Sequence, residues 1–124
     1  MPVKISPESH ILVVDDVEAI CTYTGMILNR LGFENVESVY DFEAAKAKIT
    51  NVHLDLVILD LNLPDGNGLD LLDLLQYHKM HCKVLICSGQ SQEHNMSTAL
   101  ENGAVGFMVK PVTETSIISA IERL

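Results

Sequence analysis

Three aspartates directly follow apolar segments that have the length of strands. Asp15 and Asp16 come after the run HILVV, and Asp60 comes after DLVIL. If the two runs are neighbouring strands, the carboxylates meet at one edge of a sheet, where their repulsion raises the pKa of at least one of them unless a cation intervenes. Mg²⁺ suits such a shallow site, because it binds one or two carboxylates and keeps water molecules for a phosphate-bearing substrate. The three aspartates therefore predict a divalent-metal site.

Two further reactive side chains end apolar segments later in the chain. Ser88 follows KVLIC, and Lys110 follows VGFMV. Together with the metal, these groups could receive a phosphoryl group: Asp60 would attack phosphorus, and Lys110 would neutralise charge on the phosphoryl oxygens. Each residue also has an ordinary interpretation, as a helix N-cap, a turn residue or a solvated loop residue. Their joint occurrence at four predicted strand ends favours the phosphoryl site.

The elements that would position these residues are five strands alternating with helices. The strand candidates cover residues 10–14, 35–39, 55–59, 83–87 and 105–109. Most of them are rich in Val, Ile and Leu without alternation, which is typical of parallel strands covered on both faces. Residues 35–39 alternate between apolar and polar side chains, so we expect them at an edge of the sheet.

Apolar residues at helical spacing follow each predicted strand. The first helix ends before Gly32, a residue type typical of helix C-termini. Asp41, Ser91 and Thr113 are the predicted N-caps of the second, fourth and fifth helices, and Gly103 would close the fourth. This alternation predicts a single-domain α/β fold with a doubly wound (βα)5 parallel sheet, because right-handed crossovers place helices on both faces.

The composition excludes several classes of function. The 124 residues include 17 acidic and 8 basic side chains, for a formal net charge of −9, which repels phosphate backbones. We therefore expect no direct nucleic-acid binding by this chain. No apolar run approaches the ~20 residues of a membrane helix, and the N-terminus has no signal-peptide pattern. A cytoplasmic protein without a membrane span is expected.

The cysteines predict free thiols. An odd number, Cys21, Cys82 and Cys87, does not indicate a disulfide framework in such a chain. His78 and His81 lie near Cys82, but no second ligand pair at zinc spacing accompanies them. A zinc site is therefore disfavoured.

Four motifs resemble those of one known family, the CheY-like receiver domains of two-component response regulators. ILVVDD, LVILDLNLPDGNGLDLL, ICSGQ and GFMVKP occur in the order and spacing of that family. The resemblance spans residues 10–124 and leaves residues 1–9 as a short N-terminal tail. It implies a flavodoxin-like sheet with strand order 2-1-3-4-5.

The resemblance also implies roles for the acidic residues. Asp60 matches the phosphoacceptor, Asp16 the direct Mg²⁺ ligand, and Asp15 its acidic partner, which usually acts through water. Asn62 matches the residue whose backbone carbonyl binds the metal, for which Mn²⁺ can substitute. Asn62 and Gln90 match the positions that tune the rate of dephosphorylation.

The later motifs match the parts of the family that respond to phosphorylation. Ser88 matches the switch hydroxyl, Gly89 the small residue that leaves room for the phosphoryl group, and Lys110 the phosphoryl-binding lysine. Phe107 matches the aromatic switch residue, where many members have tyrosine. Without the resemblance, Phe107 would be interpreted as a core residue. The bond between Lys110 and Pro111 matches one that is cis in the family.

The family's mechanism implies the partners. A sensor histidine kinase or a histidine phosphotransfer protein would donate the phosphoryl group to Asp60, and the surface formed by the fourth helix, fifth strand and fifth helix would then change shape. An output domain or effector protein would bind that surface, and a phosphorylation-dependent homodimer is a further expectation. Such a protein is a switch and not an enzyme.

Three alternatives share parts of this pattern. A phosphorylation-independent interaction module on the same fold would usually lack some of the site residues. A small phosphatase of the haloacid dehalogenase type, with an aspartate nucleophile, would need a second aspartate two residues after Asp60, where this chain has Asn62. A flavodoxin-type cofactor binder would have a phosphate loop after the first strand, where Asp15 and Asp16 would repel phosphate.

Overall fold

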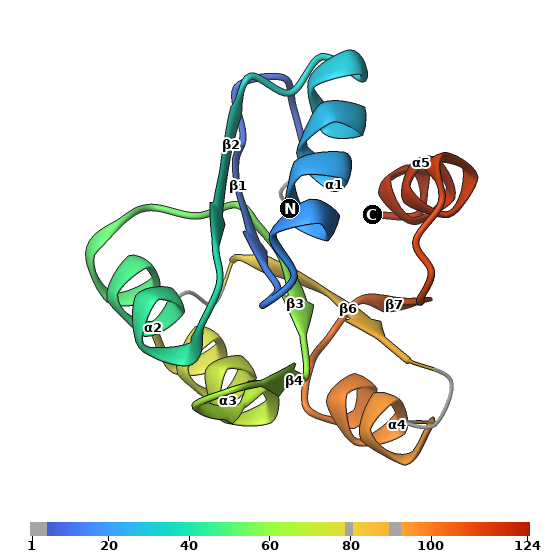
Figure 1. Cartoon of the computed structure of the whole chain (residues 1–124). Coiled ribbons are helices and arrows are strands. Elements are labelled where there is room, and N and C mark those ends of the chain that lie inside the picture. Colours follow the sequence, from blue (N-terminus) through green and yellow to red (C-terminus); the bar gives the residue numbers. More distant parts are fainter. Residues whose placement is uncertain (1–4, 79–80, 90–92) are drawn as a thin grey trace.

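Five parallel strands form the central sheet of the computed structural model, which describes residues 5–78, 81–89 and 93–124 (Figure 1). Their order across the sheet is β2-β1-β3-β6-β7. The strands are β1 (His10–Val14), β2 (Asn35–Val39), β3 (Leu56–Asp60), β6 (Lys83–Ser88) and β7 (Gly106–Val109). This order confirms the predicted arrangement 2-1-3-4-5, with the alternating strand β2 at an edge.

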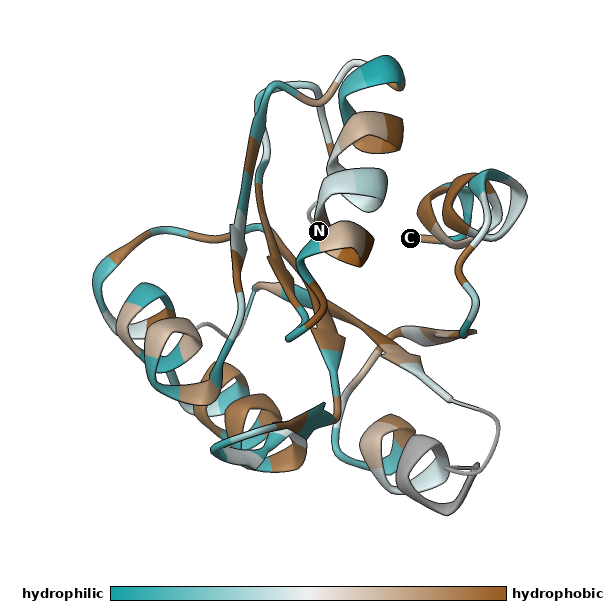
Figure 2. Ribbon diagram, in the orientation of Figure 1, coloured by the Kyte–Doolittle hydropathy of each residue, from teal (hydrophilic) through white to brown (hydrophobic). Residues whose placement is uncertain are grey.

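Helices cover both faces of the sheet, as the doubly wound topology requires. They are α1 (Glu18–Arg30), α2 (Phe42–Asn51), α3 (Gly68–His78), α4 (Glu93–Glu101) and α5 (Glu114–Glu122). One apolar cluster joins α1 and α5 to the sheet, and a second joins α2, α3 and α4 to the opposite face. Figure 2 shows the most hydrophobic residues along the central strands. No helix within the described ranges is long and apolar enough to cross a membrane.

Two of the predicted helix starts are confirmed by hydrogen bonds. The Asp41 carboxylate accepts the backbone N–H of Ala44 at 2.7 Å at the start of α2. At the start of α5, Thr113 and Ser116 satisfy each other's backbone N–H groups in a capping box. The predicted cap Ser91 lies outside the described residues.

The predicted C-terminus of the first helix is also confirmed. Gly32 has a φ of 103°, and its N–H donates to the carbonyl of Asn29, while the N–H of Phe33 donates to the carbonyl of Leu28. These bonds form a Schellman motif, in which a left-handed residue closes the helix.

Strand boundaries differ slightly from the prediction. Strand β3 lies one residue later than predicted and ends at Asp60, strand β6 extends by one residue to Ser88, and β7 begins one residue later, at Gly106. Asp60 and Ser88 belong to the strands because both keep their ladder partners in the parallel sheet. A small antiparallel hairpin, β4 (Asn62–Leu63) and β5 (Gly66–Asn67), follows β3 and was not predicted. Strands of two residues are too short to show periodicity in the sequence.

The glycines of α1 give a paired stability prediction. Gly32→Ala should lower the free energy of unfolding by about 1 kcal/mol, because a side chain is strained at positive φ. Gly25→Ala, inside the same helix, should raise it by about 0.5–1 kcal/mol, because alanine is the better helix former and the added Cβ meets no atom within 4 Å. Urea denaturation measures both. Equal effects of the two substitutions would contradict the assigned end of α1.

Candidate functional site

The site lies at the carboxyl ends of the strands, where the parallel register brings the predicted residues together. Asp15 follows β1, and its N–H donates to the carbonyl of Val39 at the end of β2. Asp60 is the last residue of β3 and pairs with Cys87 of β6. The N–H of Lys110, directly after β7, donates to the Ser88 carbonyl at 2.8 Å. Residues far apart in the sequence thus converge because their strands end at the same edge.

Lys110 joins the two buried carboxylates. Its Nζ lies 2.9 Å from Oδ2 of Asp15 and 3.0 Å from Oδ2 of Asp60. The other oxygen of each carboxylate accepts a backbone N–H: Oδ1 of Asp15 accepts from Val17 at 2.9 Å, and Oδ1 of Asp60 accepts from Asn62 at 3.0 Å. In each carboxylate, one oxygen is therefore held by the Lys110 ammonium and the other by a backbone N–H.

Burial sets the electrostatics of this group. Asp15 and Asp60 are only 2% and 4% exposed. Burial raises the pKa of Asp60, although the N–H of Asn62 and the ammonium of Lys110 oppose that effect. Burial alone lowers the pKa of Lys110, but its hydrogen bonds with the two carboxylates outweigh burial and hold the pKa above its ordinary value. Two buried negative charges thus share one positive charge.

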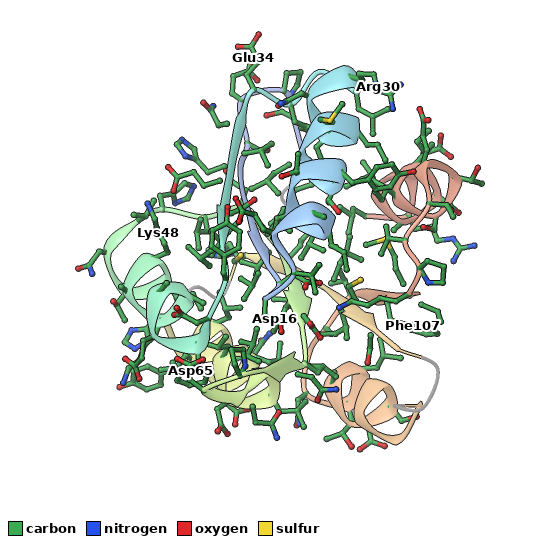
Figure 3. All side chains as sticks on the ribbon, in the orientation of Figure 1. Asp16, Arg30, Glu34, Lys48, Asp65 and Phe107 are labelled. Carbon is green, nitrogen blue, oxygen red and sulfur yellow. The ribbon has the colours of Figure 1, made fainter. Side chains whose placement is uncertain are left out.

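A divalent cation would correct that imbalance. One carboxylate oxygen from each of Asp15, Asp16 and Asp60 lies within 4.8 Å of the other two, and this is the sole group of three such potential ligands found in the described part of the chain. Asp16 is exposed to solvent beside the buried pair, at the carboxyl end of β1 (Figure 3). Hard oxygen ligands that are open to water on one side fit Mg²⁺ or Mn²⁺.

Two of the ordinary interpretations, the helix N-cap and the solvated loop lysine, are not supported. The N-cap of α1 is Val17, which has no side-chain cap, so neither Asp15 nor Asp16 caps that helix. The Lys110 side chain is only 22% exposed and is paired with two carboxylates, unlike a lysine in a solvated loop.

The remaining predicted residues surround this group. Ser88 is fully buried at the end of β6, and a Cβ on the adjacent Gly89 would meet no atom within 4 Å. Phe107 is 47% exposed on β7 and faces away from the acidic group (Figure 3), so its interpretation as a core residue is wrong. The bond between Lys110 and Pro111 is cis. Gln90 lies outside the described residues.

The cysteines do not belong to this group of potential metal ligands. All three are buried and none of them forms a disulfide, as predicted. Burial raises the pKa of Cys21 to about 11 and that of Cys87 to about 12, so both thiols are protonated near neutral pH.

One residue, Asp65, has a role that was not predicted from the sequence. It was given no function of its own within the motif LVILDLNLPDGNGLDLL, but its carboxylate accepts the N–H groups of Phe42 and Glu43 at the start of α2. The partners are more than twenty residues away in the sequence. An aspartate in a turn carries no signal that would identify so distant a helix.

Known proteins resemble this chain over nearly its whole length. The family model of the response regulator receiver domain matches residues 11–122. Protein CcdB of Bacillus subtilis is 31% identical over 117 residues, 94% of this chain and 97% of that protein. Chemotaxis protein CheY of Listeria monocytogenes is 30% identical over 113 residues, 91% and 95% of the two chains. The solved CheY-like response regulator receiver domain protein of Methanospirillum hungatei is 31% identical, with a TM-score of 0.84 over 93% and 91%.

The raised pKa of Asp60 predicts that this residue costs stability. Asp60→Asn should raise the free energy of unfolding of the metal-free protein at neutral pH by about 0.5–2 kcal/mol, because Lys110 and Asp15 then form a balanced pair. The change is measured as a higher midpoint of urea denaturation. The gain should shrink as the pH falls towards 3.8, the ordinary pKa, because Asp60 itself becomes protonated.

Asp70→Asn is the matched control, because it removes the same charge from an exposed residue in the first turn of α3. This variant should stay within about 0.5 kcal/mol of wild type. A lower midpoint for Asp60→Asn at neutral pH would contradict the charge imbalance.

Proposed function

This chain belongs to the response regulator receiver domain family, and we propose that its Asp60 accepts a phosphoryl group from the phosphohistidine of a sensor histidine kinase or histidine phosphotransfer protein. One observation carries the proposal: the Nζ of Lys110 contacts Asp60 and Asp15 at once, beside Asp16. This arrangement holds a nucleophilic carboxylate, a fixed positive charge and a set of metal ligands together at one edge of the sheet.

The transfer uses groups that the fold already holds in place. A carboxylate oxygen of Asp60 attacks phosphorus, the new O–P bond forms, and the P–N bond to the donor histidine breaks. Asp15, Asp16 and Asp60, with the carbonyl of Asn62, would hold Mg²⁺, which supplies charge neutralisation at the phosphoryl oxygens. Lys110 contributes a second positive charge next to the acceptor. The buried strand β3 keeps the nucleophile fixed.

The product would act as a switch and not as an enzyme. Phosphorylation adds close to two negative charges and three acceptor oxygens to a buried site, for which Lys110 and the hydroxyl of Ser88 are the nearby donors by position. Movement of Ser88 and Gly89 would make room for Phe107, now 47% exposed, to turn inward. The surface of α4, β7 and α5 would then bind an output domain, an effector or a second copy of the chain.

Acetyl phosphate tests the acceptor directly. Wild-type protein incubated with acetyl phosphate and Mg²⁺ should gain the mass of one phosphoryl group in intact-mass spectrometry, and Asp60→Asn should gain none. Removal of Mg²⁺ with EDTA should also abolish the gain. Asp70→Asn, with the same change in charge, should react like wild type. Mg²⁺-dependent modification of Asp60→Asn would refute the proposal.

The role of Asp16 has a separate test. Asp16→Ala should abolish saturable Mg²⁺ binding near neutral pH, because it removes the solvent-facing carboxylate of the group. Isothermal titration calorimetry measures the affinity. An unchanged affinity in this variant would show that the metal is bound elsewhere.

A further inference from the structure

The hairpin after Asp60 is docked onto the start of helix α2. Its tip carries Asp65, whose Oδ1 accepts the N–H of Phe42 at 2.6 Å and whose Oδ2 accepts the N–H of Glu43 at 3.2 Å. These are the first two residues of α2, whose N–H groups have no partner within the helix. Asp65 is labelled in Figure 3 where the hairpin meets the lower end of α2.

A packing contact reinforces these hydrogen bonds. Gly66, directly after Asp65, lies so close to the ring of Phe42 that an added Cβ would be 2.5 Å from its Cδ2. Any side chain at this position would push the hairpin away from α2. The tip is therefore held to α2 both by charge-assisted hydrogen bonds and by close packing.

The other end of the hairpin is fixed beside the acceptor. The N–H of Gly68 donates to the Leu61 carbonyl at 2.9 Å, and an added Cβ on Gly68 would be 2.6 Å from the carbonyl oxygen of Asp60. Between the two anchored ends lies Asn62, which pairs with Asn67 across the hairpin and donates its N–H to Oδ1 of Asp60. The backbone of Asn62 is thus held from both sides.

We propose that Asp65 is a positioning residue for the metal and phosphoryl site: by clamping the hairpin to α2, it fixes the backbone of Asn62 against the Asp60 carboxylate. The inference rests on the proposed function for the metal-binding role of Asn62. Nothing in Asp65 itself reaches the site. It acts through the hairpin, so that the start of α2 helps to hold the backbone that follows the acceptor Asp60.

The same helix start supplies a matched control. Asp41 also caps α2, through the N–H of Ala44 at 2.7 Å, but Asp41 lies on the loop before α2 and not on the hairpin. The N–H contacts lower the pKa of Asp65, so its carboxylate is charged at neutral pH. Asp65→Ala and Asp41→Ala each remove one negative charge and one helix cap. Only the first substitution releases the hairpin.

Amide hydrogen exchange in the metal-free protein tests the clamp itself. In Asp65→Ala the amides of Asn62 and Gly68 should exchange at least about threefold faster than in wild type, because the hairpin opens locally. In Asp41→Ala these two amides should keep their wild-type rates, while that of Ala44 exchanges faster. Equal protection of Asn62 and Gly68 in the two variants would overturn the inference.

Mg²⁺ affinity, measured by calorimetry, tests the consequence for the site. Asp65→Ala should raise the Kd about three- to tenfold. This is somewhat less than the roughly 10–100-fold loss of metal affinity typical of mutating a group that hydrogen-bonds directly to a metal-binding residue. Asp65→Asn keeps one acceptor oxygen and should fall in between, and it serves where the alanine variant does not fold. Asp41→Ala removes the same charge but leaves the hairpin clamped, so its Kd should stay within about twofold of wild type.

The outcomes separate the two claims. If wild type binds no Mg²⁺, the proposed function fails, and hydrogen exchange at Asn62 and Gly68 still decides whether Asp65 clamps the hairpin. If wild type binds Mg²⁺ and the Asp65 variants bind it as tightly as Asp41→Ala, the positioning role is wrong while the proposed function stands.

Discussion

The structure depends on an unequal sharing of charge at one edge of the sheet, where the ammonium of Lys110 serves two buried carboxylates. Asp15 and Asp60 each contact this ammonium at about 3 Å, and water cannot solvate them because both are almost fully buried. Such a group costs stability in the metal-free protein. By our proposal, the same imbalance makes the edge a site for a divalent cation and for a phosphoryl group. The two apolar clusters of the core offset the cost.

By our proposals, the elements around this charge cluster form a rigid part and a responsive part. On one side, the hairpin from Asn62 to Asn67 is clamped to α2 by Asp65 and packed against Phe42 through Gly66. On the other side, Ser88 ends a buried strand, but Phe107 stands half exposed on the neighbouring strand. A charge added at Asp60 would therefore displace the side of β6 and β7 and leave the α2 side in place. That asymmetry would direct the response towards α4, β7 and α5.

Much of this was predictable from the sequence, for identifiable reasons. Apolar runs predicted most of the strands, and alternation predicted the edge strand β2. Parallel strands that end at one edge bring Asp60 and Lys110 together whatever their separation in the chain. The hairpin was missed because two-residue strands have no period, and the clamp by Asp65 was missed because its partners in α2 are distant. The exposure of Phe107 could not be predicted from an apolar strand, since the extent to which neighbouring elements cover a side chain is a property of the tertiary structure.

We propose that the carboxylate at the end of β3, that of Asp60, is the group that becomes phosphorylated. Borohydride reduction of the phosphorylated protein tests it most directly, because the reagent converts an aspartyl phosphate to homoserine and leaves free carboxylates unchanged. Peptide mapping by tandem mass spectrometry then locates the modified residue. If Asp60 is the phosphorylated residue, homoserine is found at position 60 and nowhere else. Homoserine at Asp15 or Asp16, or a phosphorylated protein with no homoserine at all, would contradict it.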